Sequence, residues 1–235
     1  MPEKQGWETS EAAYHYLRTV DVLVPWRREI LSVIADLAAA FTPDEPRMLD
    51  IGSGAGDVTA AILEVKPKAS VCMVDFSDEM NEISQERFRN NPRVRIVKYD
   101  ANDGIPGGRF DCVVSCFAIH HVEPDNRVKL YSSIHEALPP GGLFITGDRF
   151  VEESAHLSEY LFDQWISVMV TRIRDELGVD KTFTEVRDSQ LRNEKEMGDK
   201  PGTVWETSRD LRLAGFKTVD CVWKHMNLAI ITAVK

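Results

Sequence analysis

The residues best suited to chemistry form a glycine-rich turn at 49–57, which reads Leu-Asp-Ile-Gly-Ser-Gly-Ala-Gly-Asp. An apolar run precedes the turn and a helical pattern follows it, so backbone N–H groups and the positive end of a helix face the ligand. Asp75 ends a second apolar run, 19 residues after Gly56. At that place a carboxylate accepts hydrogen bonds from ribose hydroxyls. The turn and the acid together predict a site for a nucleoside cofactor.

The charges around the turn favour S-adenosylmethionine (SAM) over a dinucleotide. In the dinucleotide pattern G-x-G-x-x-G the third glycine would fall on Asp57, and Asp50 lies on the other side of the turn. Both carboxylates oppose a pyrophosphate. SAM has no phosphate, and the two acids can attract its ammonium group directly or through water. No G-K-[ST] follows the turn, which excludes a P-loop.

The periodicity of the sequence predicts the elements that position this turn. Helical patterns cover 11–20 and 26–41, and five apolar runs between 48 and 148 alternate with helical segments. Such alternation predicts a parallel sheet with helices on both faces. The last two strands, 217–224 and 227–235, are joined by too few residues for a crossover helix, so we expect them to be antiparallel.

Residues 151–200 interrupt this alternation with two helical patterns. An insertion at this point of the chain is where a cap over a ligand cleft would lie. One face carries an apolar stripe at helical spacing, made of Phe162, Trp165, Met169 and Ile173. We expect this face to cover the mouth of the cleft together with the N-terminal helices. A closed, largely dry chamber would follow.

Five motifs in order resemble the class I SAM-dependent methyltransferases over about residues 45–150. They are L-D-I-G-S-G-A-G from 49, V-D-F-S from 74, Y-D-A from 99, F-D-C-V-V-S-C-F-A-I-H-H-V from 110 and L-P-P-G-G from 138. The segments V-P-W-R-R-E-I at 24–30 and L-A-G-F…W-K-H-M-N-L-A at 213–229 are similar to the subgroup that contains carboxy-SAM synthase. Arg209 and Arg212 lie near the expected place of the arginine with which that synthase holds its carboxylated product.

The resemblance implies an α/β fold with a Rossmann-like, seven-stranded, mostly parallel sheet whose last hairpin is antiparallel. With the segment boundaries above, the chain divides into a helical N-terminal lid at 1–45, a SAM-binding domain at 46–150 and 201–235, and a helical cap inserted at 151–200.

The resemblance also implies a cofactor site, residue by residue. The glycines lie along the methionine part of SAM, and Asp75 binds the ribose. Phe76 and Met80 sandwich the adenine, and Asp100 and Ala101 reach its amino edge. The residues expected to bind SAM are Asp50, Gly52, Ser53, Gly54, Gly56, Asp75, Phe76, Met80, Asp100, Ala101, Cys116, Phe117 and Arg27.

Two groups of side chains are candidates for the chemistry of transfer. His120 and His121 follow the fourth strand, in a loop that faces the methyl group in this fold, although either is also compatible with a structural role. Tyr14 and Tyr16 lie in the N-terminal helices that close over SAM in this family, and tyrosines can face the sulfonium. Arg27 can pair with the methionine carboxylate. Aromatic packing and a solvated arginine are the alternatives.

No metal site is expected. Adjacent residues such as His120 and His121 point their side chains apart, and no Cys, His or Asp with ligand spacing accompanies them. Asp148 and Arg149 end the fifth strand, which places them at the edge of the site. There they can shape the site or bind the acceptor.

Composition narrows the function. The 38 acidic and 28 basic side chains give a net charge of −10, and no stretch concentrates lysine and arginine, so a nucleic-acid or anionic-membrane partner is disfavoured. No apolar run approaches the length of a membrane span. The four cysteines form no C-x-x-C pair and indicate reduced thiols of a cytoplasmic protein.

We therefore expect a cytoplasmic SAM-dependent methyltransferase that acts on a small-molecule acceptor. A first alternative keeps SAM but changes the reaction, either to carboxy-SAM formation or to attack on the γ-carbon of SAM's own methionyl chain with release of methylthioadenosine. A second alternative is a non-catalytic SAM-binding protein. A homodimer is compatible with the sequence.

Overall fold

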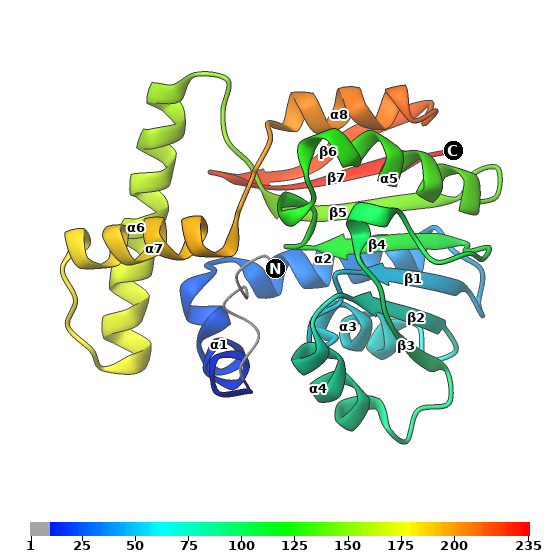
Figure 1. The fold of residues 1–235 in the computed structure, drawn as a ribbon, viewed down its shortest axis with the longest axis horizontal. Coiled ribbons are helices and arrows are strands. Elements are labelled where there is room, and N and C mark those ends of the chain that lie inside the picture. Colours follow the sequence, from blue (N-terminus) through cyan, green and yellow to red (C-terminus); the bar gives the residue numbers. More distant parts are fainter. Residues whose placement is uncertain (1–9) are drawn as a thin grey trace.

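The computed structural model describes the backbone of residues 10–235 and the side chains of residues 17–235. Its centre is a seven-stranded sheet in the order β3-β2-β1-β4-β5-β7-β6 (Figure 1). Strands β1 to β5 are parallel, whereas β7 is antiparallel to both β5 and β6. The strands are β1 (Arg47–Ile51), β2 (Ser70–Asp75), β3 (Val94–Lys98), β4 (Cys112–Cys116), β5 (Leu143–Arg149), β6 (Thr218–His225) and β7 (Leu228–Val234). The predicted sheet and its antiparallel last hairpin are confirmed.

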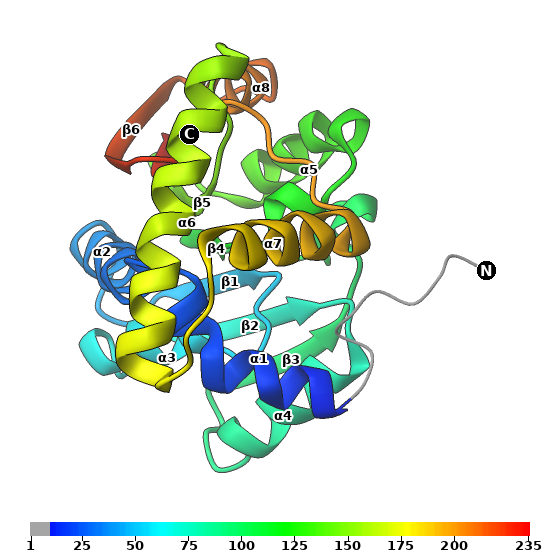
Figure 2. The same cartoon turned by 90° about the vertical axis from the view of Figure 1, so that its left-hand side faces the viewer.

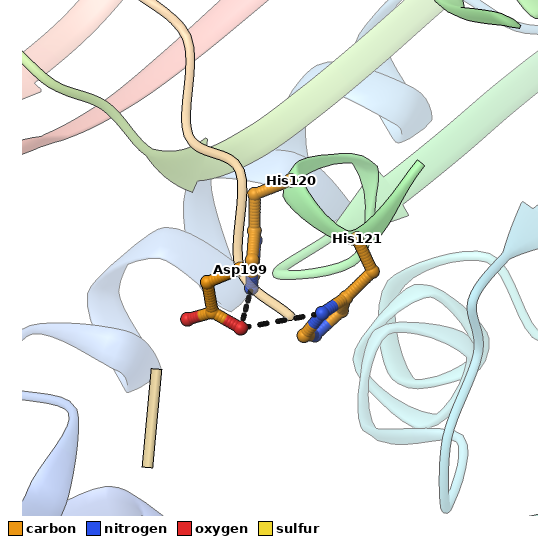
Figure 3. A group of neighbouring side chains, drawn as sticks. All are labelled: His120, His121 and Asp199. Carbon is orange, nitrogen blue, oxygen red and sulfur yellow. Dashed lines mark ion pairs between the residues drawn. The ribbon is translucent and has the colours of Figure 1, made fainter. Parts of the chain in front are cut away.

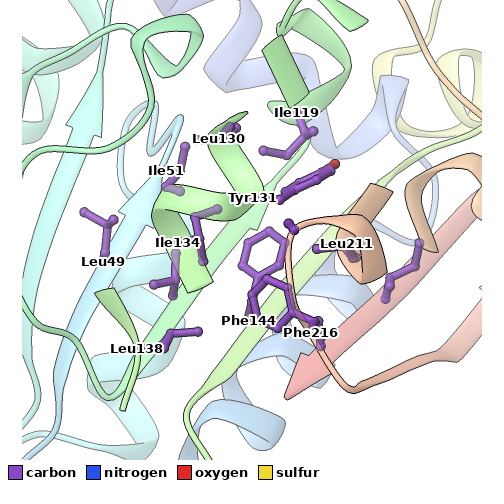
Figure 4. Close-up of a cluster of buried hydrophobic side chains, with 14 of the residues drawn as sticks. Leu49, Ile51, Ile119, Leu130, Tyr131, Ile134, Leu138, Phe144, Leu211 and Phe216 are labelled. Atoms are coloured by element: carbon purple, nitrogen blue, oxygen red, sulfur yellow. The ribbon is translucent and has the colours of Figure 1, made fainter. Parts of the chain in front are cut away.

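Helices cover both faces of the sheet, because consecutive residues of each strand point to opposite sides and both sides are apolar. Met48 and Cys112 pack with α2 and α3 on one face, whereas Leu49 and Phe144 pack with α5 and α8 on the other (Figure 4). The helices are α1 (Ser10–Leu23), α2 (Arg27–Ala40), α3 (Asp57–Val65), α4 (Asp78–Phe88), α5 (Pro124–Ala137), α6 (Ala155–Leu177), α7 (Phe183–Met197) and α8 (Val204–Leu213), with short 3₁₀ turns η1 (Ala101–Asp103) and η2 (Ile119–His121). None of the helices described is both long and apolar enough to cross a membrane.

The order of the strands reverses between β1 and β4. In such sheets a ligand binds at the reversal, outside the carboxyl ends of the strands. The glycine turn follows β1, Asp75 ends β2, and η2 follows β4. The topology therefore brings the predicted site residues to one edge of the sheet.

The insertion forms the two expected helices, α6 and α7, and an isolated parallel bridge between Val151 and Thr203 closes its base. Helix α6 lies beside both α1 and α7, at the edge where the parallel strands end (Figure 2). Trp165 and Met169 of α6 form an apolar cluster with Val22 of α1. The apolar stripe of α6 is thus buried against α1 and α7.

Candidate active site

A cavity of about 190 Å³ opens at the carboxyl ends of the central strands. Residues from segments far apart in the sequence line its wall. The sequence-predicted residues among them are Arg27, Gly52, Ser53, Gly54, Asp75, Phe76, Met80, Asp100, Ala101, Cys116, Phe117 and His121.

The glycine turn forms the floor of this cavity and is held by β2. The N–H groups of Gly52 and Ser53 donate to the carbonyl of Val74, over 2.8 and 3.0 Å. Gly52 has a φ of +64°, and a Cβ there would lie 2.2 Å from the Cβ of Ala118, so only glycine fits. A Cβ on Gly54 would meet no atom within 4 Å among the residues described. The backbone at this position is therefore open to a ligand.

Asp75 connects the turn to the cavity. Its Oδ2 accepts a hydrogen bond from the N–H of Gly54 at 2.8 Å, and its Oδ1 accepts one from the N–H of Ser77 at 2.9 Å. Burial raises the pKa of the Asp75 carboxyl. Each carboxylate oxygen keeps an acceptor site after these bonds, so the group can also accept from ribose hydroxyls.

The wall beyond Asp75 combines apolar side chains with an acid. Phe76 is 38% exposed, whereas Met80 is buried, and both line the cavity. The hydroxyl of Ser77 accepts a hydrogen bond from the N–H of Met80 at 3.2 Å and so caps α4. Asp100 accepts from the N–H of Asn102 at 2.8 Å. This wall suits a flat aromatic base with hydrogen-bond donors at its edge.

Arg27, the first residue of α2, ties the N-terminal helices to the turn. Its guanidinium lies 2.9 Å from Asp21 Oδ1 and 2.5 Å from Asp57 Oδ2. Arg87 contacts the other oxygen of Asp57 at 2.6 Å. Burial alone would raise the pKa of Asp57, but the two guanidinium groups outweigh it and hold the pKa below its ordinary value. The charge of Asp57 is therefore balanced inside the protein, which weakens the electrostatic argument against a dinucleotide.

Asp50 and Gly56 do not line the cavity but lie behind the turn. Asp50 is fully buried, and its Oδ2 accepts a hydrogen bond from the hydroxyl of Thr59 at 2.7 Å. Burial raises the pKa of Asp50 to about 7. A Cβ on Gly56 would lie 2.4 Å from the ring of Phe88. Both residues shape the turn from inside the protein.

Comparison with known proteins agrees with this geometry. A family described as "Methyltransferase domain" matches residues 48–142. A carboxy-S-adenosyl-L-methionine synthase from Nautilia profundicola is 23% identical over 99% of this chain and 96% of its own. A protein of the same name from Aeromonas hydrophila is 27% identical over 90% of this chain and 83% of its own.

Solved structures show the same fold. A structure from Methanococcus maripaludis, described as an S-adenosyl-L-methionine-dependent methyltransferase, superposes with a TM-score of 0.66 at 20% identity, over 100% of this chain and 97% of that chain. Human N-acetylserotonin methyltransferase in complex with SAM gives a TM-score of 0.64 at 16% identity, over 97% of this chain and 57% of that chain. This chain spans less than two thirds of the length of that enzyme and of PigF, where it covers 61%.

The chain carries a methyltransferase domain over residues 48–142 and is similar to the class I SAM-dependent methyltransferase superfamily. It is a SAM-dependent transferase, and SAM is its cofactor or substrate. Its curated relatives include proteins named carboxy-SAM synthase, as the ends of the sequence indicated.

The cavity of this methyltransferase-fold protein fits SAM. The hydroxyl of Ser53 is buried on the wall and has no hydrogen-bond partner within the described part of the chain. The open space at Gly54 lets a ligand approach the backbone. Asp75 and Asp100 supply acceptors for hydroxyl and amino groups. The neighbouring acids suit a ligand with a sulfonium and an ammonium.

The two histidines of η2 have different environments. His121 lines the cavity, whereas His120 does not. His120 Nδ1 lies 2.5 Å from Asp148 Oδ1 at the end of β5. Burial would raise the pKa of Asp148, but His120 outweighs it and lowers the pKa below its ordinary value. Burial lowers the pKa of His121 to about 3, so this imidazole is neutral at physiological pH.

Asp199 meets these histidines from the linker between α7 and α8. Its Oδ1 lies 3.3 Å from His121 Nδ1 and 3.8 Å from His120 Nε2 (Figure 3). Burial raises the pKa of Asp199. Sequence reasoning missed this residue, because nothing in its local pattern shows that the linker returns to the end of β4.

Cys116 and Phe117 end β4 at the cavity wall. Phe117 has a φ of +53°, in the left-handed region, where the chain leaves the strand. Burial raises the pKa of the Cys116 thiol far above its ordinary value, so this cysteine is not a nucleophile.

Other parts of the predicted site lie differently or outside the description. The side chains of Tyr14 and Tyr16 are outside the described residues. Leu17, one turn further along α1, lines the cavity and was not predicted.

The expectation that the stripe on α6 covers the mouth of the cleft is corrected. Trp165 and Met169 contact α1 and α7, and no described residue of the stripe lines the cavity. An apolar helical stripe indicates burial but not the partner, and here the partners are α1 and α7. The insertion acts on the cavity through α1 and through Asp199.

Proposed function

We propose that the protein transfers a methyl group from SAM to a small-molecule acceptor. The observation that carries this proposal is the charge of the cavity wall. Among the described lining residues, Arg27 is the one arginine or lysine, and its guanidinium is engaged by Asp21 and Asp57. A carboxylated form of SAM would need a further cation for its added carboxylate. The described residues of this wall supply no second arginine or lysine for it, whereas methyl transfer needs none.

The size of the cavity supports a small acceptor. Leu17 of α1 and Arg27 of α2 belong to its wall, so the N-terminal helices reduce its opening. A cavity of about 190 Å³ is of a size that takes small molecules.

We assign the residues of this cavity the following roles. Bound SAM supplies an electrophilic methyl group on its sulfonium. Asp75 and Asp100 hold the nucleoside by accepting hydrogen bonds, and Phe76 and Met80 contact the base. His121 is neutral and on the wall, so its ring can make a hydrogen bond to the acceptor and orient it.

The second candidate is carboxy-SAM formation. It is favoured by the names of the relatives, which this chain matches over 83% to 96% of their length. The two arginines nearest to the expected carboxylate contact lie elsewhere. Arg209 stacks on Trp205 and pairs with Asp210, and Arg212 donates to the carbonyl of Val219. Neither lines the cavity.

Product analysis separates the candidates. The protein is incubated with SAM alone and with SAM plus panels of small hydroxyl, amine and thiol acceptors, and all adenosyl products are followed by mass spectrometry. We expect S-adenosylhomocysteine only when a suitable acceptor is present. Methylthioadenosine formed from SAM alone, or a carboxylated SAM formed with any added carboxylate donor, would replace the proposal. SAM binding without turnover across the panels would favour a non-catalytic role.

The cytoplasmic location stays a prediction.

A further inference from the structure

Three side chains aim their ligand atoms at one point between η2 and the α7–α8 linker (Figure 3). These atoms are His120 Nε2, His121 Nδ1 and Asp199 Oδ1, which all lie within 4.8 Å of one another. The two adjacent rings do not diverge as the sequence suggested. Their centroids are 4.1 Å apart at an angle of 45°.

Two of the three atoms lack a hydrogen bond. His121 Nδ1 and Asp199 Oδ1 are both shielded from solvent and find no hydrogen-bond partner among the residues that the structure covers. A buried polar atom without a partner destabilises the fold. Two such atoms facing each other from separate segments indicate a missing ligand that both can bind.

The ligand atoms are positioned from behind. Asp148 holds Nδ1 of His120 at 2.5 Å, which leaves Nε2 free to bind a metal. Arg149 lies 3.6 Å from Oδ2 of Asp199, which leaves Oδ1 on the side of the histidines. The N–H of Lys200 donates to the carbonyl of His120 at 2.8 Å and fixes the linker to η2. This pattern of supporting contacts is typical of metal sites.

The spacing suits one ion. Metal–ligand bonds of about 2.0–2.2 Å place neighbouring ligand atoms about 3.0–3.5 Å apart. The distances of 3.3 and 3.8 Å from Asp199 Oδ1 to the two imidazole nitrogens need only small side-chain rotations to meet that range.

The charges around the point suit a dication. The charged and titratable groups that act on Asp199 are the imidazole of His120, the guanidinium of Arg149 and the carboxylates of Glu194 and Asp148. Arg149 also pairs with Glu194. With Asp199 itself, three negative charges and one positive charge leave two negative charges when both imidazoles are neutral.

We propose that His120, His121 and Asp199 bind one divalent transition-metal ion of the Zn²⁺ type. Two imidazoles and one carboxylate favour such an ion over Mg²⁺ or Ca²⁺, which prefer oxygen ligands. Because His121 also lines the cavity, the ion lies at the cavity's edge. On the proposed methyl transfer, on which this role rests, its open coordination positions would hold an oxygen or sulfur atom of the acceptor and lower the pKa of that group.

Metal titration tests this site without reference to turnover. The full-length protein, freed of metal with a chelator, is titrated with Co²⁺ by visible absorption and with Zn²⁺ by calorimetry. We expect one ion per chain and no comparable binding of Mg²⁺. His121→Ala and Asp199→Asn should each weaken binding at least 10-fold.

The controls keep the outcome clear. His156→Ala removes an exposed histidine of α6, and Cys221→Ser removes an exposed thiol that could bind Zn²⁺ elsewhere; neither should change the affinity. Circular dichroism and urea denaturation show whether each variant is folded. Absence of stoichiometric binding to the unaltered protein would overturn the proposal. So would affinity that stays the same in folded His121→Ala and Asp199→Asn.

Discussion

Asp75 binds the glycine turn from one side and faces the cavity from the other. Because its two oxygens accept from Gly54 and Ser77, the carboxylate both orders the turn and presents acceptor sites to a ligand. Ordering and binding therefore depend on the same group.

Replacing Asp75 with alanine should weaken SAM binding by about 1.5–3 kcal/mol, the scale for a charge-assisted hydrogen-bonding group. Calorimetry with SAM measures the affinity. Asp78→Ala is the matched control. Asp78 is an exposed acid three residues after Asp75, and it pairs with Lys98. Equal affinity of Asp75→Ala and the unaltered protein would remove Asp75 from the site.

Asp50 makes stability depend on pH. Its pKa is 3.8 when unperturbed and about 7 in the fold. Between these values the unfolded chain releases this proton while the native state keeps it, so the free energy of unfolding falls as pH rises from about 4 to about 7. Above about 7 the penalty is complete.

Asp50→Asn should remove this penalty while keeping an acceptor for Thr59. We expect the variant's advantage in free energy of unfolding to grow by about 2 kcal/mol between pH 5.5 and pH 8. Urea denaturation at the two pH values measures it. An advantage that is the same at both would show that Asp50 is ionised throughout.

Single residues were predictable where a local pattern determines their place. The glycine turn and Asp75 follow strands of recognisable pattern, so the sequence located them at one edge of the sheet. Asp199 had no such signal, because its approach to His121 depends on the path of α7 and its linker.

At the scale of elements, α1 and α6 stabilise each other. Trp165 is 3% exposed in the cluster with Val22 and lies over the guanidinium of Arg149 at 5.9 Å. The contact joins the lid, the insertion and the charged cluster near Asp199.

Trp165→Ala should therefore destabilise the protein first, by about 3–5 kcal/mol, with loss of turnover as a consequence. This reverses the order expected from the sequence, in which Trp165 roofs the cavity. Trp205→Ala is the control, since Trp205 is 60% exposed on α8 and should change stability by about 0.5 kcal/mol or less. Urea denaturation and proteolysis of 151–203 measure both. Unchanged stability with lost turnover would restore the roofing role.

The helices and strands of the fold were readable because apolar runs and helical periods alternate along the chain. The partner of each apolar face was not, since periodicity reports burial without naming the neighbour. The stripe on α6 shows the difference, because it is buried as expected but against α1.

For the whole molecule, ligand binding should appear as thermal stability. SAM at about 100 times its dissociation constant adds about 2.7 kcal/mol, which raises Tm by about 5–10 °C for a chain of this size. NAD at the same concentration should give no shift in Tm, even though Arg27 and Arg87 balance the negative charge of Asp57. Differential scanning fluorimetry compares the two, with Asp75→Ala as a variant whose SAM shift should fall to about half or less. A saturable shift with NAD would contradict the choice of cofactor.

The bridge between Val151 and Thr203 brings the two ends of the insertion together. The segment between them can therefore vary in length without moving the ends of the strands, provided that the face of α6 that packs on α1 keeps its apolar side chains. The bridge therefore marks a place where one helical insertion can be exchanged for another. Such an exchange would change the acceptor that is bound but not the cofactor. Grafting the corresponding segment of a relative between residues 151 and 203 is accordingly a direct route to altered selectivity on an unaltered sheet.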